Sequence, residues 1–195
     1  SVVIVGKRYL CGKCDHWHSG TATGFAIAAN AIVTSLHVID ADRESTFAVM
    51  TAAGAFHPVV EVLAANAPAD LVVLRVDCDD LPPLPMRAGL APGETVHVLS
   101  HPDRAFWYFT SGVLARRFPF RHRSGTSVEM LDITAGFARG SSGGPVIDAT
   151  GAVVGVVRAT DSVYYEEDGD TQRNLQLVFR RCAPIENVLD MAGGD

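Results

Sequence analysis

Gly140-Ser-Ser-Gly-Gly-Pro145 is the most informative stretch of the sequence, because it places three glycines within six residues between apolar segments. Glycine lets the backbone turn tightly and approach a ligand closely. A serine held in such a turn can present its hydroxyl while neighbouring N–H groups point at an oxyanion. Ser142 is therefore a candidate nucleophile, and a glycine-rich structural turn is the alternative interpretation.

A serine is a weak nucleophile on its own, so it needs a base, and the base needs an orienting acid. The first half of the chain offers both: His37 follows an apolar segment in Thr34-Ser-Leu-His-Val38, and Asp70 precedes the apolar run Leu71–Val76. An unpaired carboxylate at the entrance of a buried strand would be costly. Each residue alone has a structural explanation. The three together predict Ser142 as nucleophile, His37 as base and Asp70 as orienting acid.

Outward from these residues, short apolar segments alternate with turn residues along the chain. Ala29-Asn30 predicts a tight hairpin, and the proline-rich Leu81–Pro85 predicts a surface linker. Pro184 is expected in the first turn of a C-terminal helix. Many short strands at regular spacing favour a sandwich or barrels. The predicted strands are residues 22–28, 31–35, 47–51, 56–63, 71–76, 95–99, 106–115, 126–133, 145–147, 152–158 and 174–179, and the predicted apolar helix face is Ile185, Val188, Leu189 and Met191.

Composition excludes several classes of protein. The 195 residues are 48% hydrophobic and 19% charged, with a net charge of −6, so no nucleic acid partner is expected. No apolar run is long enough to span a bilayer, and Ser1–Leu10 lacks the pattern of a signal peptide. The four cysteines are too few for a disulfide-built scaffold.

Several motifs in order resemble those of the trypsin-like serine peptidases, and within them the HtrA/Deg branch. The resemblance covers nearly the whole chain, and the order of the motifs is more specific than any one of them. It rests on Gly20-Thr-Ala-Thr-Gly-Phe-Ala-Ile27, Val33-Thr-Ser-Leu-His-Val38, Ala69-Asp-Leu-Val-Val-Leu74, Ser100-His-Pro102, Thr110-Ser-Gly-Val-Leu114, Arg139-Gly-Ser-Ser-Gly-Gly-Pro145, Gly151-Ala-Val-Val-Gly155 and Val178-Phe-Arg-Arg-Cys-Ala-Pro-Ile185.

The resemblance implies an all-β, chymotrypsin-like fold of two antiparallel six-stranded barrels with a short C-terminal helix. Residues 1–80 would form an N-terminal barrel carrying His37 and Asp70, and residues 95–182 a C-terminal barrel carrying Ser142. Residues 81–94 would link them, and residues 183–195 would be the helix and tail. The chain ends where an HtrA/Deg protein continues into a peptide-binding PDZ domain, so no such domain is expected in it.

The resemblance also implies a mechanism: Ser142 attacks a peptide carbonyl, and the N–H groups of Gly140 and Ser142 form the oxyanion hole. No cofactor is expected for catalysis. The expected substrate pocket consists of Gly136, Phe137, Ala138, Arg158 and Ala159.

Two positions depart from the family pattern. Ser141 stands where digestive enzymes carry the aspartate that pairs with a newly cut N-terminus, so activation by such cleavage is not expected. Arg158 is an unusual long cation beside the substrate. It would narrow the pocket, attract an acidic substrate residue or point to solvent. Because the pocket wall offers no carboxylate, small or medium aliphatic residues are expected before the cleaved bond.

Cys11-Gly-Lys-Cys14-Asp-His16-Trp-His18 lies outside the family pattern. Cys11, Cys14, His16 and His18 could supply four tetrahedral ligands to a structural Zn²⁺. The close spacing of the two histidines leaves little slack, since a strand would point both to one side. A Cys11–Cys14 disulfide and free thiols are the alternatives.

Two charged runs are assigned to the surface. Arg116–Arg123 is basic with two aromatic residues, and a solvated loop near the active site is favoured over a binding role. Glu166–Asp170 lacks the alternating ligands of a calcium loop, so it predicts an exposed hairpin tip.

The sequence therefore predicts a serine endopeptidase with a protein or peptide substrate. Two rivals stay open: a protease-like module that binds extended peptides or unfolded chains, and a processing protease limited to its parent polypeptide or one partner. The resemblance slightly favours a periplasmic or secreted location, and the oligomeric state is left open.

Overall fold

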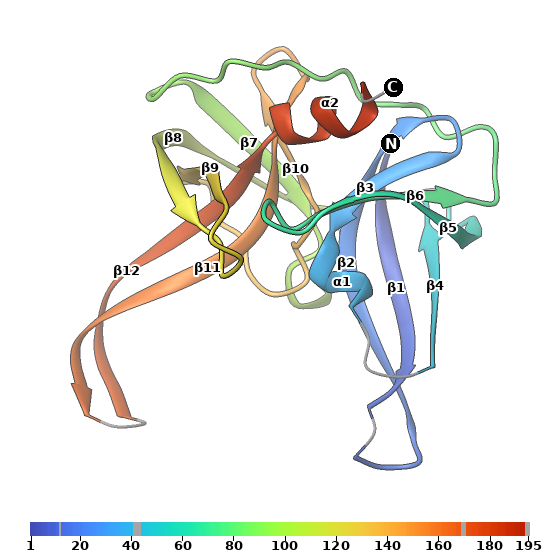
Figure 1. Cartoon of the computed structure of the whole chain (residues 1–195), viewed down its shortest axis with the longest axis horizontal. Helices are drawn as coiled ribbons and strands as arrows, with labels where there is room; N and C mark the ends of the chain where they lie inside the picture. Colours follow the sequence, from blue (N-terminus) through green and yellow to red (C-terminus); the bar gives the residue numbers. More distant parts are fainter. Residues whose placement is uncertain (12, 41–43, 169–170, 194–195) are drawn as a thin grey trace.

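Two barrels make up the part of the chain that the computed structural model describes, residues 1–11, 13–40, 44–168 and 171–193. Within these residues twelve strands close into two antiparallel barrels, one with strand order β1-β2-β3-β6-β5-β4 and one with order β10-β11-β12-β9-β8-β7 (Figure 1). Each barrel is built from a contiguous half of the chain. The predicted all-β fold with two six-stranded barrels and a short C-terminal helix is confirmed.

The first barrel follows the hydrophobic pattern of its strands. Val3 and Val5 alternate inward from β1, and β6 is buried along almost its whole length. The β2–β3 turn at Ala29-Asn30 and the bounds of β6 are as predicted. The sequence pattern assigned no strand to the segment that forms β1. The elements are β1 (Val2–Leu10), β2 (Trp17–Ala28), β3 (Ala31–Ser35), α1 (Leu36–Ile39), β4 (Ser45–Met50), β5 (Phe56–Asn66) and β6 (Leu71–Val76).

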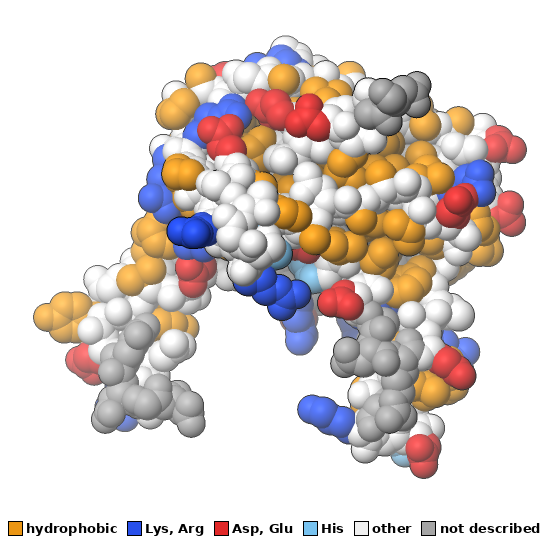
Figure 2. All heavy atoms as spheres, in the orientation of Figure 1, with side chains coloured by type: hydrophobic (Ala, Val, Ile, Leu, Met, Phe, Trp, Pro, Cys, Tyr) orange, Lys and Arg blue, Asp and Glu red, His pale blue; other side chains and the backbone are white. Residues whose placement is uncertain are grey.

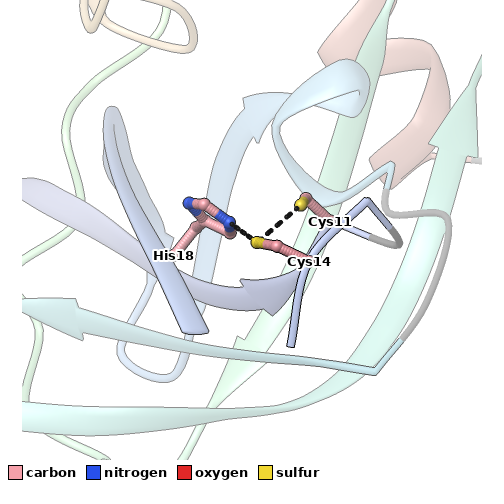
Figure 3. A group of neighbouring side chains, drawn as sticks. All are labelled: Cys11, Cys14 and His18. Carbon is pink, nitrogen blue, oxygen red and sulfur yellow. Dashed lines mark hydrogen bonds between the residues drawn. The ribbon is translucent and has the colours of Figure 1, made fainter. Parts of the chain in front are cut away.

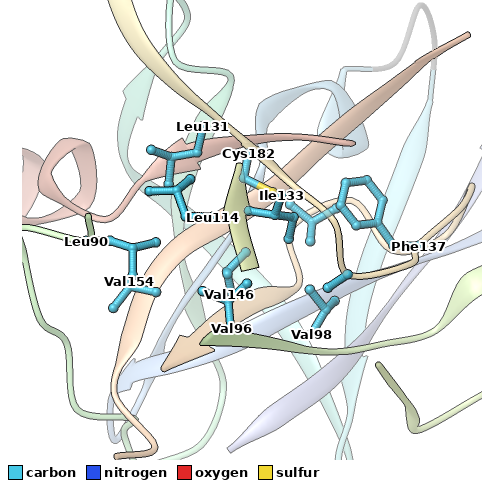
Figure 4. Close-up of a cluster of buried hydrophobic side chains, with 12 residues drawn as sticks. Leu90, Val96, Val98, Leu114, Leu131, Ile133, Phe137, Val146, Val154 and Cys182 are labelled. Atoms are coloured by element: carbon cyan, nitrogen blue, oxygen red, sulfur yellow. The ribbon is translucent and has the colours of Figure 1, made fainter. Parts of the chain in front are cut away.

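The second barrel closes around its own core. Leu114, Leu131, Val146 and Cys182 meet there from four different strands (Figure 4). Burial raises the pKa of the Cys182 thiol, so this cysteine behaves as an inert apolar group. The elements are β7 (Thr95–Ser100), a 3₁₀ turn (Pro102–Arg104), β8 (Tyr108–Arg121), β9 (Ser127–Ile133), β10 (Pro145–Asp148), β11 (Val153–Asp168), β12 (Thr171–Pro184) and α2 (Glu186–Ala192).

Three strands of the second barrel are longer than predicted. β8 continues to Arg121, so the loop predicted at Arg116–Arg123 is wrong except at its last two residues, which follow the strand. Ion pairs of Arg116 with Asp132 and of Arg117 with Glu129 join β8 to β9 there, which stabilises a strand without an apolar pattern. β11 and β12 likewise pair far beyond the barrel. Of the predicted tip Glu166–Asp170, residues 169–170 lie outside the described residues.

The two longest hairpins, β1–β2 and β11–β12, project on the same side of the molecule with a hollow between them (Figures 1 and 2). The β11–β12 projection is exposed even at apolar positions, since Tyr165 is 78% and Leu175 54% accessible.

The C-terminal helix α2 differs in detail from its prediction. Pro184 ends β12 instead of standing in the first helical turn, because the helix begins at Glu186. Ile185 and Val188 are buried as expected, but Leu189 is 36% accessible and lies outside the buried face. Neither this helix nor any other among the described residues is long and apolar enough to cross a membrane.

Candidate active site

His37 and Asp70 come together at one end of the first barrel. His37 lies on the single-turn helix α1, directly after β3, and Asp70 precedes β6 with a positive φ of 59°. The Asp70 carbonyl accepts a hydrogen bond from the Leu36 N–H at 2.9 Å, and its carboxylate Oδ1 accepts one from the His37 N–H at 2.9 Å. Asp70 therefore fixes the backbone of α1 as well as the ring on it.

The side chains of Asp70, His37 and Ser142 form one continuous chain of contacts. Nδ1 of His37 lies 2.7 Å from Oδ2 of Asp70, and Nε2 of His37 lies 3.0 Å from Oγ of Ser142. Both are ordinary hydrogen-bond lengths. This geometry holds the imidazole with its Nδ1–H toward the carboxylate and its free Nε2 toward the hydroxyl.

Two glycines shape the loop that carries Ser142. Gly140 has φ +95° and Gly143 has φ +82°, values that side-chain-bearing residues rarely adopt. A Cβ on Gly140 would lie 2.5 Å from the His101 carbonyl oxygen, and one on Gly143 would lie 2.2 Å from Oγ1 of Thr34. Both positions therefore require glycine for space as well as for conformation.

Thr23 of β2 braces this loop from the first barrel. Its hydroxyl donates to the Gly140 carbonyl at 2.9 Å, and its N–H donates to the Ser142 carbonyl at 3.0 Å. Among the described residues, the N–H groups of Gly140 and Ser142 meet no protein acceptor. The loop thus binds two of its carbonyls to the first barrel and leaves the N–H groups of the same two residues available to an acceptor outside the protein.

Sequence reasoning missed Thr23, although it lies within a quoted motif. A threonine in an apolar strand carries no sign that its hydroxyl will meet a loop 117 residues away. Ser141, by contrast, is fully buried, and Oγ of Ser100 donates to its hydroxyl at 2.9 Å. A neutral serine, hydrogen-bonded to a second one, therefore occupies the position where digestive enzymes carry an aspartate.

A cavity of about 410 Å³ opens next to Ser142 and His37. Its wall includes the predicted residues Phe137, Ala138, Arg158 and Ala159. Gly136 is not among the lining residues, and its carbonyl accepts a hydrogen bond from Thr110 Oγ1 at 2.7 Å.

Arg158 turns its side chain away from solvent. Its Nε lies 3.6 Å from Oδ2 of Asp70, its guanidinium lies 4.7 Å from the Phe120 ring centroid, and only 18% of the side chain is accessible. The cation therefore faces the carboxylate that also binds His37, which excludes the solvent-facing alternative.

The predicted zinc residues are only partly assembled. Cys11, Cys14 and His18 offer ligand atoms that lie within 4.8 Å of one another. His16 is exposed and outside this group, and only its carbonyl oxygen lies near Cys14 Sγ, at 4.0 Å. Hydrogen bonds from the Lys13 backbone and the Cys14 side chain lower the pKa of the Cys11 thiol to about 7.

A double β-barrel with Ser, His and Asp in contact between the barrels is the arrangement of the chymotrypsin-like class. The structure is similar over 97% of the chain to "HtrA-type protease AlgWS227A with decapeptide", with a TM-score of 0.77, 17% identity and 61% of that chain covered. At this identity the likeness concerns the fold. Residues 22–156, more than half of the chain, match the family described as "Trypsin-like peptidase domain". The chain therefore belongs to the trypsin-like peptidase family.

Curated relatives agree with this family. The chain is 30% identical over 183 residues to "Serine protease HTRA2, mitochondrial" of Bos taurus, a match that covers 89% of the chain and 39% of the relative. It is 30% identical over 166 residues to "Serine protease Rv3671c" of Mycobacterium tuberculosis, with 79% and 39% covered. The chain thus spans about two fifths of the length of these relatives.

Proposed function

We propose that this chain is a serine endopeptidase in which Ser142 is the nucleophile, His37 the general base and Asp70 the orienting acid. The observation that carries the proposal is the contact chain from Asp70 to His37 at 2.7 Å and from His37 to Ser142 at 3.0 Å. It ends on the loop whose Gly140 and Ser142 N–H groups meet no acceptor in the described part of the chain. A purely structural turn has no need of all these features together.

In the proposed reaction, Oγ of Ser142 attacks the carbonyl carbon of a peptide bond while Nε2 of His37 takes the hydroxyl proton. Asp70 stabilises the imidazolium without becoming protonated itself. The N–H groups of Gly140 and Ser142 stabilise the negative oxygen of the tetrahedral intermediate, a contribution of roughly 3 kcal/mol for one such donor. His37 then protonates the leaving amine, and water hydrolyses the acyl-enzyme by the same route. These residues need no cofactor for the reaction.

Space on both sides of Ser142 favours cleavage of internal bonds. The 410 Å³ cavity lies on one side, and a second cavity of about 200 Å³ lined by Val5, Thr21 and Val38 also reaches His37 and Ser142. An extended chain can therefore continue in both directions from the attacked carbonyl, as an endopeptidase requires.

The proposed specificity is for small or medium aliphatic residues before the cleaved bond. The lining of the 410 Å³ cavity contains Phe137, Ala138 and Val157 and includes no carboxylate. Two cations lie on this wall: Arg158 is directed at Asp70 and Phe120, and the exposed Arg139 lies 3.2 Å from a carboxylate oxygen of Asp103. A substrate Lys or Arg would find no carboxylate there, and an acidic residue would have to compete with Asp70 for Arg158 and with Asp103 for Arg139.

Labelling with a fluorophosphonate probe tests the proposal, because this reagent reacts with a serine only where a base and an oxyanion hole activate it. We expect the wild type to form one adduct, which peptide mapping assigns to Ser142, and Ser142→Ala to form none. Ser162→Ala is the matched control, since Ser162 is exposed on β11. It should label and cleave casein like the wild type.

The outcome also separates the rival functions. A wild type that binds unfolded chains but never reacts with the probe would be a binding module, and the proposal would fail. Labelling at Ser142 with cleavage of a flanking sequence but not of casein would identify a processing protease.

Loss of Ser142 should reduce turnover by roughly 10⁶, by analogy with subtilisin.

A further inference from the structure

The tip of the β1–β2 hairpin brings two thiols and one imidazole together. β1 and β2 pair in antiparallel register up to Leu10 opposite Trp17, with Tyr9 opposite His18. This register returns His18 over the connecting turn that carries both cysteines (Figure 3). The Sγ atoms of Cys11 and Cys14 lie 3.5 Å apart, and Cys14 Sγ lies 3.1 Å from His18 Nε2.

These separations are close to those of a tetrahedral zinc site. Bond lengths of about 2.3 Å to sulfur and 2.0–2.1 Å to nitrogen put two thiolates about 3.8 Å apart, and a thiolate and a nitrogen about 3.5 Å apart. Small outward movements at an exposed tip therefore suffice to admit the ion. A disulfide requires an S–S distance of about 2.05 Å, which is far shorter than the observed 3.5 Å.

We propose that Cys11, Cys14 and His18 bind one Zn²⁺ through two thiolates and Nε2 of the imidazole, with water in the fourth position. His16, the other histidine of the tip, is exposed and its ring lies outside the cluster, so it is not a ligand. The water leaves an open coordination position, unlike the four protein ligands usual in structural zinc sites. We assign the ion to the hairpin and not to the reaction, because its ligands join the two ends of the β1–β2 connection and lie outside the Asp70–His37–Ser142 chain.

A metal at this tip would also order one wall of the substrate groove, the name we give to the cavity beside the nucleophile loop that Tyr9, Arg139 and Gly140 line. The His18 ring lies 5.6 Å from the Tyr9 ring, centroid to centroid. Tyr9 in turn lines a cavity of about 320 Å³ that continues to Arg139 and Gly140, next to the nucleophile loop. A fixed imidazole therefore holds Tyr9 in place. This consequence rests on the proposed peptidase function, whereas the metal site itself does not.

The zinc content of untagged protein, purified with a non-thiol reductant and without chelators, tests the site. We expect about one equivalent in the wild type and less than about one-tenth in Cys14→Ser and His18→Ala. His16→Ala is the matched control and should keep about one equivalent. Cobalt substitution should give thiolate-to-metal charge-transfer absorption in the wild type and in His16→Ala only. Far-UV circular dichroism checks that each variant is folded.

A second cluster, His57, Cys78 and Asp80, provides an internal comparison. Cys78→Ser should leave the zinc content unchanged. Zinc that persists in Cys14→Ser but is lost in Cys78→Ser would overturn the assignment. The assignment would also be overturned if the wild type contained no zinc, or if unreduced protein contained a Cys11–Cys14 disulfide. Equal zinc content in His18→Ala and the wild type would overturn it as well.

Kinetics of the same wild-type protein test the consequence for substrate. Removal of zinc should raise KM for long peptides several-fold with little change in kcat, and added zinc should restore it. An unchanged KM would remove the link from metal to groove. If neither form cleaves peptides or reacts with a fluorophosphonate, the peptidase proposal fails, while the metal content still decides the site.

Discussion

The two barrels contribute to the site in different ways. The first supplies two side chains of the proposed triad, His37 and Asp70, from short segments directly after β3 and directly before β6. The second supplies mainly backbone: the glycine turn that presents Ser142 and the two N–H groups beside it. We therefore expect activity to be most sensitive to charge and hydrogen bonding in the first half of the chain, and to backbone conformation in the second half. Glycine requirements at Gly140 and Gly143 are the clearest expression of the second kind.

Asp70→Asn should give the largest effect on the first barrel's contribution, a fall in kcat of about 10⁴. The amide keeps the shape of the carboxylate but no longer selects the imidazole tautomer or stabilises the imidazolium. It also leaves Arg158 facing a neutral group at 3.6 Å. Steady-state cleavage of a peptide substrate measures the change. Asp77→Asn, at an exposed position after β6, should match the wild type, and a loss of less than tenfold at Asp70 would contradict its role.

The sequence predicts the residues that lie in local motifs, but it does not predict the elements that depend on pairing with distant strands. The residues of the contact chain lie in motifs whose order identifies them, and the continuous apolar run of β6 predicts that strand exactly where it lies. β1 has buried apolar residues only in its first half, and its more polar second half, up to Leu10, is held by pairing with β2 and β4. The outer parts of β8, β11 and β12 are held by cross-strand pairing and ion pairs, which leave no apolar periodicity. No sequence pattern encodes such partners.

The direction in which a side chain points could not be predicted from the sequence either. Sequence spacing treats His16 and His18 alike, yet the hairpin register brings only His18 to the cysteines. Arg158 could be recognised as unusual, but its position between Asp70 and Phe120 depends on strands far apart in the chain. Both cases depend on tertiary register, which local reasoning does not reach.

Thr23→Val tests whether the two contributions are independent, and its effect should be intermediate. Valine keeps the shape of threonine and removes the hydroxyl that binds the Gly140 carbonyl and accepts the His101 N–H at 3.1 Å. The oxyanion N–H of Gly140 then loses its support, so we expect kcat to fall by roughly 10–10² with KM little changed. The rate of fluorophosphonate labelling should fall in parallel.

Thr23→Ser is the matched control for this change. Serine retains the hydroxyl and should keep most of the wild-type kcat, whereas a simple packing defect would affect serine at least as much as valine. Equal activity of the valine variant and the wild type would show that the loop holds its conformation without the first barrel.

His101→Asn should give the smallest effect, one on stability and its pH dependence. His101 is buried beside Trp107, whose backbone N–H donates to Nδ1 of the imidazole at 3.0 Å. Burial lowers the pKa of its imidazole to about 4. The folded protein therefore keeps the ring neutral, whereas the unfolded chain takes up a proton below about pH 6.5. Its contribution to stability is complete above about pH 6.5 and is lost as the pH falls toward 4.

Asparagine keeps an acceptor for the Trp107 N–H but does not titrate in this range. Between about pH 7 and 4.5, the wild type should therefore lose about 2 kcal/mol more of its free energy of unfolding than His101→Asn does. Urea unfolding at the two pH values measures this difference of differences, which cancels the packing cost of the substitution itself. Parallel losses in the two proteins would mean that the buried ring does not remain neutral. The surroundings of His101, where the residue after β7 contacts Thr23 of the first barrel, would then be more accessible to water than the packing of the structure indicates.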